Sequence, residues 1–277
     1  MKEKTREFDY TWDDFNFLRR ISNQHSGILV PDDKFDMFYS RLSKRIRLLG
    51  FTRFKQYCDY LQNHSEEFTE FINAVTTNLT SFFRENHHFE FVAKTLLPEL
   101  LQNNKGQKQI KVWSAGCSTG EEPYSLAMTL LENAPAGWDI KILATDLDTN
   151  VLATAAEGIY PVDRISSIGE ERLRRWFQKG TGIHANKVRA KPQLRQIVHF
   201  KQLNLMQDWP MKNAFDFIFC RNVLIYFDRE TKARLAKRYA ASLKEGGYLF
   251  IGHSESLHQL DTPFYLVGNT IYKKVLA

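Results

Sequence analysis

Residues 110–122 read Ile110-Lys-Val-Trp-Ser-Ala-Gly-Cys-Ser-Thr-Gly-Glu-Glu122, and this stretch decides the fold class. Its apolar start predicts a short strand, followed by a glycine-containing loop and a helix over about residues 122–132. Gly116 and Gly120 permit positive φ and close approach of a ligand to the backbone. The spacing is neither G-x-G-x-x-G nor a P-loop, because no Lys follows Gly120. Glu121 and Glu122 would repel a pyrophosphate, so they suit a ligand that carries ammonium or hydroxyl groups.

A second strand, over residues 140–144, ends at Thr145-Asp146. Ligands of doubly wound sheets sit at the carboxyl ends of the strands, where Asp146 could accept hydrogen bonds from a ribose diol. Singly, the loop is equally compatible with a glycine-rich turn, and Asp146 with a helix cap. Their occurrence at neighbouring strand ends favours a nucleoside site.

The rest of the chain fits an α/β protein with a helical N-terminal part. Helical spacing and a Thr11 N-cap predict only helices before residue 109, including one over residues 34–49. Residues 215–220 predict a strand buried on both faces, and residues 265–275 predict a closing hairpin. Alternating strands and helices after residue 106 predict a doubly wound sheet. The polar, basic stretch between Tyr160 and His199 interrupts the alternation and predicts an inserted subdomain.

Composition narrows the class of protein further. The 277 residues are 43% hydrophobic and 25% charged, as in an ordinary globular protein. The charged start and the lack of a long apolar run predict a cytoplasmic protein without direct membrane insertion. Three scattered cysteines predict neither disulfides nor a metal site. The net charge of +6 is compatible with nucleic acid, anionic lipid or an acidic protein as partner.

The third strand end carries Cys220-Arg-Asn-Val-Leu-Ile-Tyr226 and bears on the reaction. A nucleoside with a charged, amino-acid-like tail indicates S-adenosylmethionine rather than NAD. Enzymes that methylate base amines place a Pro-Pro-aromatic element at this strand end, and cytosine-C5 enzymes use a Pro-Cys nucleophile. Neither sequence occurs, so the methyl acceptor is not expected to be a nucleobase.

Five motifs in order resemble the bacterial chemotaxis receptor methyltransferases, the CheR family. They are Thr76-Thr-Asn-Leu-Thr-Ser-Phe-Phe-Arg-Glu85, Trp113-Ser-Ala-Gly-Cys-Ser-Thr-Gly-Glu-Glu-Pro-Tyr-Ser125, Ala144-Thr-Asp-Leu-Asp148, Phe219-Cys-Arg-Asn-Val-Leu-Ile-Tyr-Phe227 and Gly252-His-Ser-Glu255. The resemblance implies a helical receptor-binding domain (residues 1–90). It also implies a class I S-adenosylmethionine-dependent methyltransferase domain (residues 91–277), with a β-subdomain inserted at about 160–200. The implied reaction is esterification of chemoreceptor glutamates, with S-adenosyl-L-homocysteine as product.

The same resemblance implies a set of site residues. It assigns cofactor contacts to Asn78, Thr80, Arg84, Glu121, Asp146, Asn204, Leu205, Arg221 and Asn222. Glu121 would meet the methionine moiety and Asp146 the ribose, with Asn204-Leu205 beside the adenine. Arg84 and Tyr226 are the candidates for orienting the incoming carboxylate. His253 is interpreted as structural, because an ionised glutamate needs no base.

The predicted partner is the cytoplasmic domain of a membrane chemoreceptor, and the protein is expected to be a monomer recruited to receptor arrays. Lys34, Arg41, Lys44 and Arg45 share one sector of the predicted helix 34–49 and are the candidates for binding the acidic receptor surface. The inserted subdomain, with its Gly180-Thr-Gly182 turn, is predicted to bind a C-terminal peptide tether of the receptor. An RNA methyltransferase and a non-catalytic S-adenosylmethionine-binding signalling module remain as alternatives.

Overall fold

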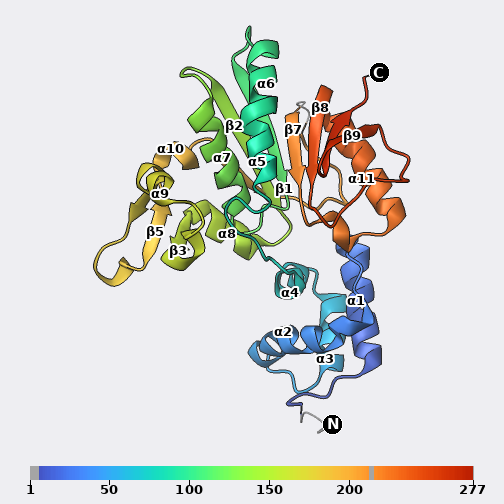
Figure 1. Cartoon of the computed structure of the whole chain (residues 1–277). Helices are drawn as coiled ribbons and strands as arrows, with labels where there is room; N and C mark the ends of the chain where they lie inside the picture. Colours follow the sequence, from blue (N-terminus) through green and yellow to red (C-terminus); the bar gives the residue numbers. More distant parts are fainter. Residues whose placement is uncertain (1–5, 212–214, 277) are drawn as a thin grey trace.

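The computed structural model describes residues 6–211 and 215–276, so the outer limits of the predicted domains, residues 1 and 277, lie outside it. A seven-stranded sheet forms the centre of the larger domain (Figure 1). Its strands, in spatial order, are β6 (Val198–Gln202), β2 (Asp139–Asp146), β1 (Gln109–Ala115), β7 (Phe215–Cys220), β8 (Leu243–Ile251), β10 (Ile271–Lys274) and β9 (Phe264–Gly268). The first five strands are parallel, and β10 pairs antiparallel with both β8 and β9. The predicted doubly wound α/β class is confirmed.

The sheet is buried on both faces, as the apolar run at residues 215–220 predicted. Phe217 and Phe219 pack on one face, with α7 (Glu121–Asn133) and the helical segment made of α5 (His87–Phe91), η2 (Val92–Leu96) and α6 (Leu97–Asn103). Ile218 and Cys220 pack on the other face, with α11 (Arg229–Ser242). The chain order reverses between β1 and β7, which is where a doubly wound sheet binds its ligand.

Four helices form the N-terminal domain, below the sheet in Figure 1: α1 (Trp12–Ser26), α2 (Phe35–Leu48), α3 (Phe54–Asn63) and α4 (Glu67–Val75). Thr11 caps α1 in a capping box with Asp14, as its position predicted. A separate aromatic-rich core, which includes Phe15, Phe38 and Phe71, holds these helices together. The predicted boundary at residue 90 lies within α5, whose Phe89 packs on the sheet.

A small antiparallel sheet projects beside the main one, in the order β3 (Ile159–Pro161), β5 (Lys187–Ala190), β4 (Phe177–Lys179) (Figure 1). It follows α8 (Thr149–Glu157) and contains α9 (Glu170–Trp176), and it confirms the expected β-subdomain. The sequence analysis missed β6, which begins at Val198 inside the segment assigned to the insertion. Its exposed His199, Lys201 and Gln202 lie at the sheet edge, which hides the strand pattern.

Candidate cofactor-binding site

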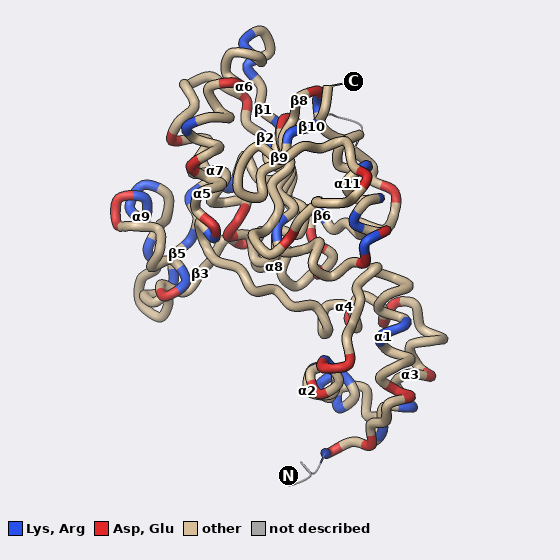
Figure 2. The backbone as a smooth tube through the Cα atoms, turned by 45° about the vertical axis from the view of Figure 1, so that its right-hand side comes forward, with Lys and Arg blue, Asp and Glu red and all other residues tan. Residues whose placement is uncertain are grey.

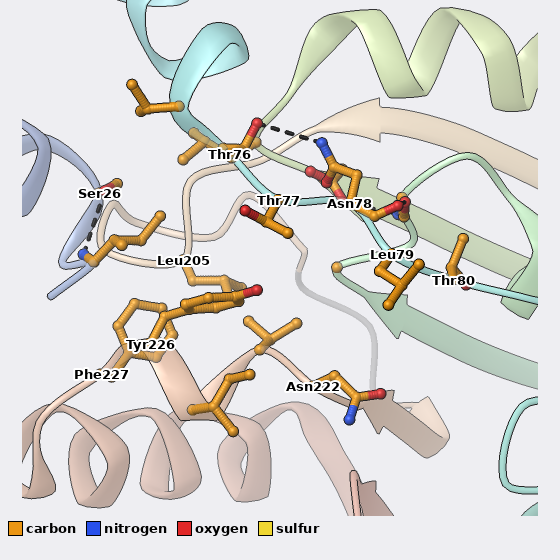
Figure 3. A pocket seen from close by; sticks show the side chains of 18 of the residues that line it. Ser26, Thr76, Thr77, Asn78, Leu79, Thr80, Leu205, Asn222, Tyr226 and Phe227 are labelled. Atoms are coloured by element: carbon orange, nitrogen blue, oxygen red, sulfur yellow. Dashed lines mark hydrogen bonds between the residues drawn. The ribbon is translucent and has the colours of Figure 1, made fainter. Parts of the chain in front are cut away.

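A cavity of about 360 Å³ lies at the carboxyl ends of β1, β2 and β7, between the sheet and the helical domain. Its volume falls in the range of small-ligand pockets. The interdomain linker, residues 76–86, forms one wall, and the segment after β7 forms another. Figure 3 shows Thr77 and Asn78 of the linker across the cavity from Tyr226 and Asn222.

The β1–α7 loop requires glycine where the sequence analysis singled it out. Gly116 has a φ of 88°, and a Cβ there would collide with the Val223 side chain. Gly120 has a φ of 95° and stands at the N-cap of α7. Both positions are in the left-handed region that other residues avoid. The backbone therefore turns tightly at the sheet edge and leaves room for a ligand.

Asp146 lines the cavity at the end of β2, as predicted. One carboxylate oxygen accepts the backbone N–H of Ser118 at 2.8 Å, and the other accepts that of Asp148 at 3.1 Å. Burial raises the pKa of Asp146, and these backbone donors oppose the shift. Each oxygen keeps a free lone pair, because a carboxylate has about four acceptor sites. The pair of oxygens can therefore accept both hydroxyls of a ribose.

Glu122, rather than Glu121, faces the cavity. Glu121 is buried, accepts the Thr119 hydroxyl at 2.6 Å and lies 3.5 Å from Arg164. Glu122 lines the cavity, accepts the Ser114 hydroxyl at 2.7 Å and lies 3.6 Å from Arg221. Burial raises the pKa of Glu122, and the nearby Arg221 cation opposes this rise. The carboxylate available to a ligand ammonium is thus one residue beyond the predicted Glu121.

Arg221 is a buried cation in the cavity wall. It donates to the backbone carbonyl of Arg84 and lies 3.4 Å from Glu85, while its Nε has no hydrogen-bond partner. Arg84 lines the cavity too, and its guanidinium donates to the Leu79 carbonyl at 2.9 Å. Two cations thus stand beside Glu122. Such a set suits the carboxylate and ammonium of an amino-acid moiety.

The linker is held over the cavity by hydrogen bonds to the start of α8. Asp148, the N-cap of α8, accepts the Thr76 hydroxyl at 2.7 Å and the Asn78 amide at 2.8 Å. Asn78 and Thr80 both line the cavity. Asn78 therefore helps to fix the linker through its side-chain amide, and its backbone carbonyl accepts the Ser118 hydroxyl at 3.2 Å.

Part of the cavity lining is apolar. It includes Leu147, Leu203, Leu205 and Val223. The neighbouring Asn204 is buried, donates to the His25 carbonyl at 2.6 Å and accepts the Met206 N–H at 2.9 Å. This part can enclose a flat, apolar-faced base such as adenine.

Glu255 supports the segment after β7, a role that the sequence analysis missed. Its buried carboxylate accepts the N–H groups of Asn222 at 2.9 Å, Ile225 at 3.0 Å and Gly252 at 2.5 Å. Asn222 has a φ of 58°, and a Cβ on Gly252 would collide with its amide. The resemblance implied no role for the glutamate of the Gly252-His-Ser-Glu255 motif. Its function is to hold Asn222 and η5 (Leu224–Tyr226) in place.

The basic residues of α2 are less free than their helical spacing suggested. Arg41 donates to the carbonyls of Val75 and Thr76 at 2.8 and 2.5 Å. Arg45 makes two 2.6 Å bonds to the buried Glu67. In Figure 2, acidic segments accompany the basic ones around α2. Lys34 lies before α2, in the 3-10 turn η1 (Asp32–Lys34), so it does not share the helix with the other three as predicted. It lines the cavity and pairs with Asp33 at 2.9 Å, and Lys44 is exposed.

The strand ends of this doubly wound sheet carry an acid, an apolar wall and a cluster of one carboxylate and two cations, and they lack a phosphate-binding loop. This combination is typical of a site for a nucleoside joined to an amino acid. The cofactor of the protein is S-adenosylmethionine.

The chain belongs to the CheR methyltransferase family. The family's S-adenosylmethionine-binding domain matches residues 78–273, and its all-α domain matches residues 13–76. The chain is 43% identical to chemotaxis protein methyltransferase 2 of Pseudomonas aeruginosa, over 96% of this chain and 95% of that protein. It is 45% identical to the chemotaxis protein methyltransferase of Escherichia coli, over 92% and 89% of the two chains.

Two further observations concern the described residues alone. Over residues 6–211 and 215–276, no helix combines the length and apolarity needed to cross a bilayer. The same residues contain no group of three or more His, Cys, Asp or Glu side chains arranged to hold a metal ion.

Proposed function

We propose that this S-adenosylmethionine-dependent methyltransferase esterifies glutamate side chains of membrane chemoreceptors in chemotactic adaptation. The observation that carries the proposal is that five chemically suited side chains line one cavity. Asp146, Glu122 and Arg221 suit the cofactor, and Arg84 and Tyr226 offer a cation and a phenol to the incoming carboxylate. Relatives named chemotaxis protein methyltransferases support the biological setting.

The cofactor fits the residues present. Asp146 would accept the ribose hydroxyls, Glu122 would bind the ammonium, and Arg84 or Arg221 would bind the carboxylate. Asn204 and Leu205 would flank the adenine, and Asn78 and Thr80 would cover it from the linker. When bound, S-adenosylmethionine supplies a methyl group on a positively charged sulfur that accepts the electron pair of the broken C–S bond.

The residues of the chain need to hold and desolvate the reactants rather than move a proton. A glutamate side chain has a pKa of about 4.3, so it is ionised at neutral pH and is already nucleophilic. Burial raises the pKa of Tyr226, so its phenol stays protonated and can donate to the incoming carboxylate. Arg84 would bind the second carboxylate oxygen. Orientation and partial exclusion of water would supply the rate acceleration.

The helical domain and the β-subdomain would both take part in docking the receptor. Lys34 and Lys44 can attract an acidic receptor surface, whereas Arg41 and Arg45 act first in holding the helical domain together. The β-subdomain would bind the receptor's C-terminal peptide and raise the local concentration of substrate. A pull-down with that peptide should retain the protein, and no retention at high peptide concentration would contradict the tether.

The proposal is tested with S-adenosylmethionine carrying a radioactive methyl group. The protein is incubated with receptor-bearing membranes and, separately, with total RNA. Base-labile label on the receptor is the expected result, because methyl esters hydrolyse in base. Label on RNA would identify an RNA methyltransferase. No label on either acceptor, with cofactor binding intact, would identify a non-catalytic binding module.

A further inference from the structure

Three of the apolar side chains that line the cavity are also exposed to solvent, and none of them has a role in the site described above. They are Leu29, which is 47% exposed, Leu79, 77%, and Ile225, 46%. All three line the cavity. They come from three segments: the α1–α2 connection, the interdomain linker and η5. We name this set the apolar rim.

The apolar rim is fixed to the site rather than carried on free loops. The N–H of Leu29 donates to the Tyr226 carbonyl at 2.8 Å. The N–H of Ile225 donates to Glu255 at 3.0 Å, and the Leu79 carbonyl accepts from Arg84 at 2.9 Å. Each rim residue is therefore linked to a residue of the candidate active site or to its support. Exposed apolar side chains that gather at one cavity, rather than being scattered singly, are typical of a binding surface.

The surroundings of the rim indicate what covers it. Lys34 and Arg84 line the same cavity and offer positive charge to a carboxylate. A glutamate that reaches the cavity from a helix brings its neighbours three and four residues away, because these lie on the same helical face. Those neighbours would meet Leu29, Leu79 and Ile225. The rim thus suits a helix in which apolar or small side chains flank the acid.

We propose that the apolar rim is the contact surface for the apolar residues that flank the methylated glutamate on a substrate helix. The inference rests on the proposed function. The apolar rim would select the substrate at short range, in addition to the long-range attraction of the acidic receptor surface by Lys34 and Lys44. Closure of apolar groups around the carboxylate would also exclude water from the reacting atoms.

The test compares Leu79→Asn and Ile225→Asn with a matched control, Leu266→Asn. Leu266 is 61% exposed on β9 and does not line the cavity. Each protein is assayed for methylation of receptor-bearing membrane vesicles and, by calorimetry, for binding of S-adenosylhomocysteine. Loss of one buried Leu or Ile contact predicts a rise in the receptor KM of about tenfold or more. We expect cofactor affinity to stay within about twofold of the wild type.

Each of the other outcomes would contradict the apolar rim, the proposed function, or both. An unchanged receptor KM in both rim variants, with the wild type active, would overturn the rim but not the proposed function. A matching loss of cofactor affinity would assign these side chains to the cofactor and also overturn the rim. An equal effect of Leu266→Asn would show a general surface effect and overturn the rim. No methylation by the wild type would overturn the proposed function and the rim with it.

Discussion

The Asp146 carboxylate can accept hydrogen bonds from the backbone and from a ligand, and a substitution can separate the two roles. Its oxygens accept backbone N–H groups of Ser118 and Asp148, and they would also accept the ribose hydroxyls. Asp146→Asn keeps the shape but replaces one acceptor with a donor. We expect the cofactor Kd to rise about ten- to a hundredfold, which corresponds to roughly 1.5–3 kcal/mol for bonds to a charged group.

Calorimetry with S-adenosylhomocysteine measures this effect. Asp139→Asn is the control, because Asp139 is exposed at the opposite end of the same strand. It should bind like the wild type. Wild-type affinity in Asp146→Asn would remove Asp146 from the site.

Substitutions at Glu121 and Glu122 test which of these neighbouring glutamates binds the cofactor, the one that the resemblance implies or the one that lines the cavity. The resemblance assigned the methionine moiety to Glu121, and the structure turns Glu122 to the cavity. Glu122→Gln keeps the acceptor for Ser114 but removes the negative charge that would face the ammonium. Its cofactor Kd should rise by about tenfold or more, whereas Glu121→Gln should change it by less than about twofold. The reverse order of the two affinities would restore Glu121 to the site.

At the scale of elements, the segment after β7 depends on Glu255. In Glu255→Gln, one of the oxygens that accept backbone N–H groups becomes a donor, so at least one buried N–H loses its partner. We expect η5 to shift and the KM for the cofactor to rise by about tenfold, while the KM for the receptor changes less. Steady-state kinetics with each substrate varied separately measure this difference. Glu157→Gln makes the same chemical change at an exposed position. Equal kinetics of Glu255→Gln and the wild type would contradict the supporting role.

The helix α2 combines a structural and a docking function, in different residues. Arg45→Met removes two of the hydrogen bonds to the buried Glu67 and leaves the one from Tyr57. The pair is only partly buried, because 21% of the Arg45 side chain is exposed. The free energy of unfolding should fall by about 1–3 kcal/mol, the cost of leaving a buried acceptor without its partner. Lys44→Met should change it by less than about 0.5 kcal/mol. Urea unfolding gives both values, and equal stability of the two variants would contradict the structural role of Arg45.

Docking is therefore better tested at Lys34 and Lys44 than at Arg41 and Arg45. The double variant Lys34→Glu/Lys44→Glu should methylate receptors more slowly at low salt, with cofactor affinity unchanged. Wild-type activity should fall with added salt, because exposed charges are screened within about 8–10 Å. A normal rate in the double variant at low salt would leave α2 without a docking role.

A helix or strand was predictable from the sequence where a single hydrophobic pattern runs through the whole element. Residues 215–220 form β7 as predicted, because a central strand buried on both faces is apolar throughout. The weak pattern of β6 failed, because a sheet edge tolerates polar residues. The position of Asp146 beside the cavity was predictable from its place at a strand end. The contacts of Arg45 with Glu67 and of Glu255 with Asn222 were not, because in each case the partner lies on a segment distant in the sequence.

At the scale of the whole molecule, the helical domain completes the site as well as covering it. Arg41 binds the end of α4, Thr76 binds the cap of α8, and Leu29 binds Tyr226. The linker and η5 are thereby held on opposite sides of one cavity (Figure 3). Neither domain alone provides the full set of lining residues.

The proposed transfer of a methyl group to a glutamate carboxylate of a chemoreceptor can be measured by mass spectrometry of receptor peptides after incubation with S-adenosylmethionine. We expect glutamates on the receptor's cytoplasmic helices to gain the mass of one methylene group and to lose it again on base treatment. Asp146→Asn should greatly reduce this gain at limiting cofactor. Receptor peptides of unchanged mass, or a methyl group on a side chain other than a carboxylate, would contradict the proposed transfer.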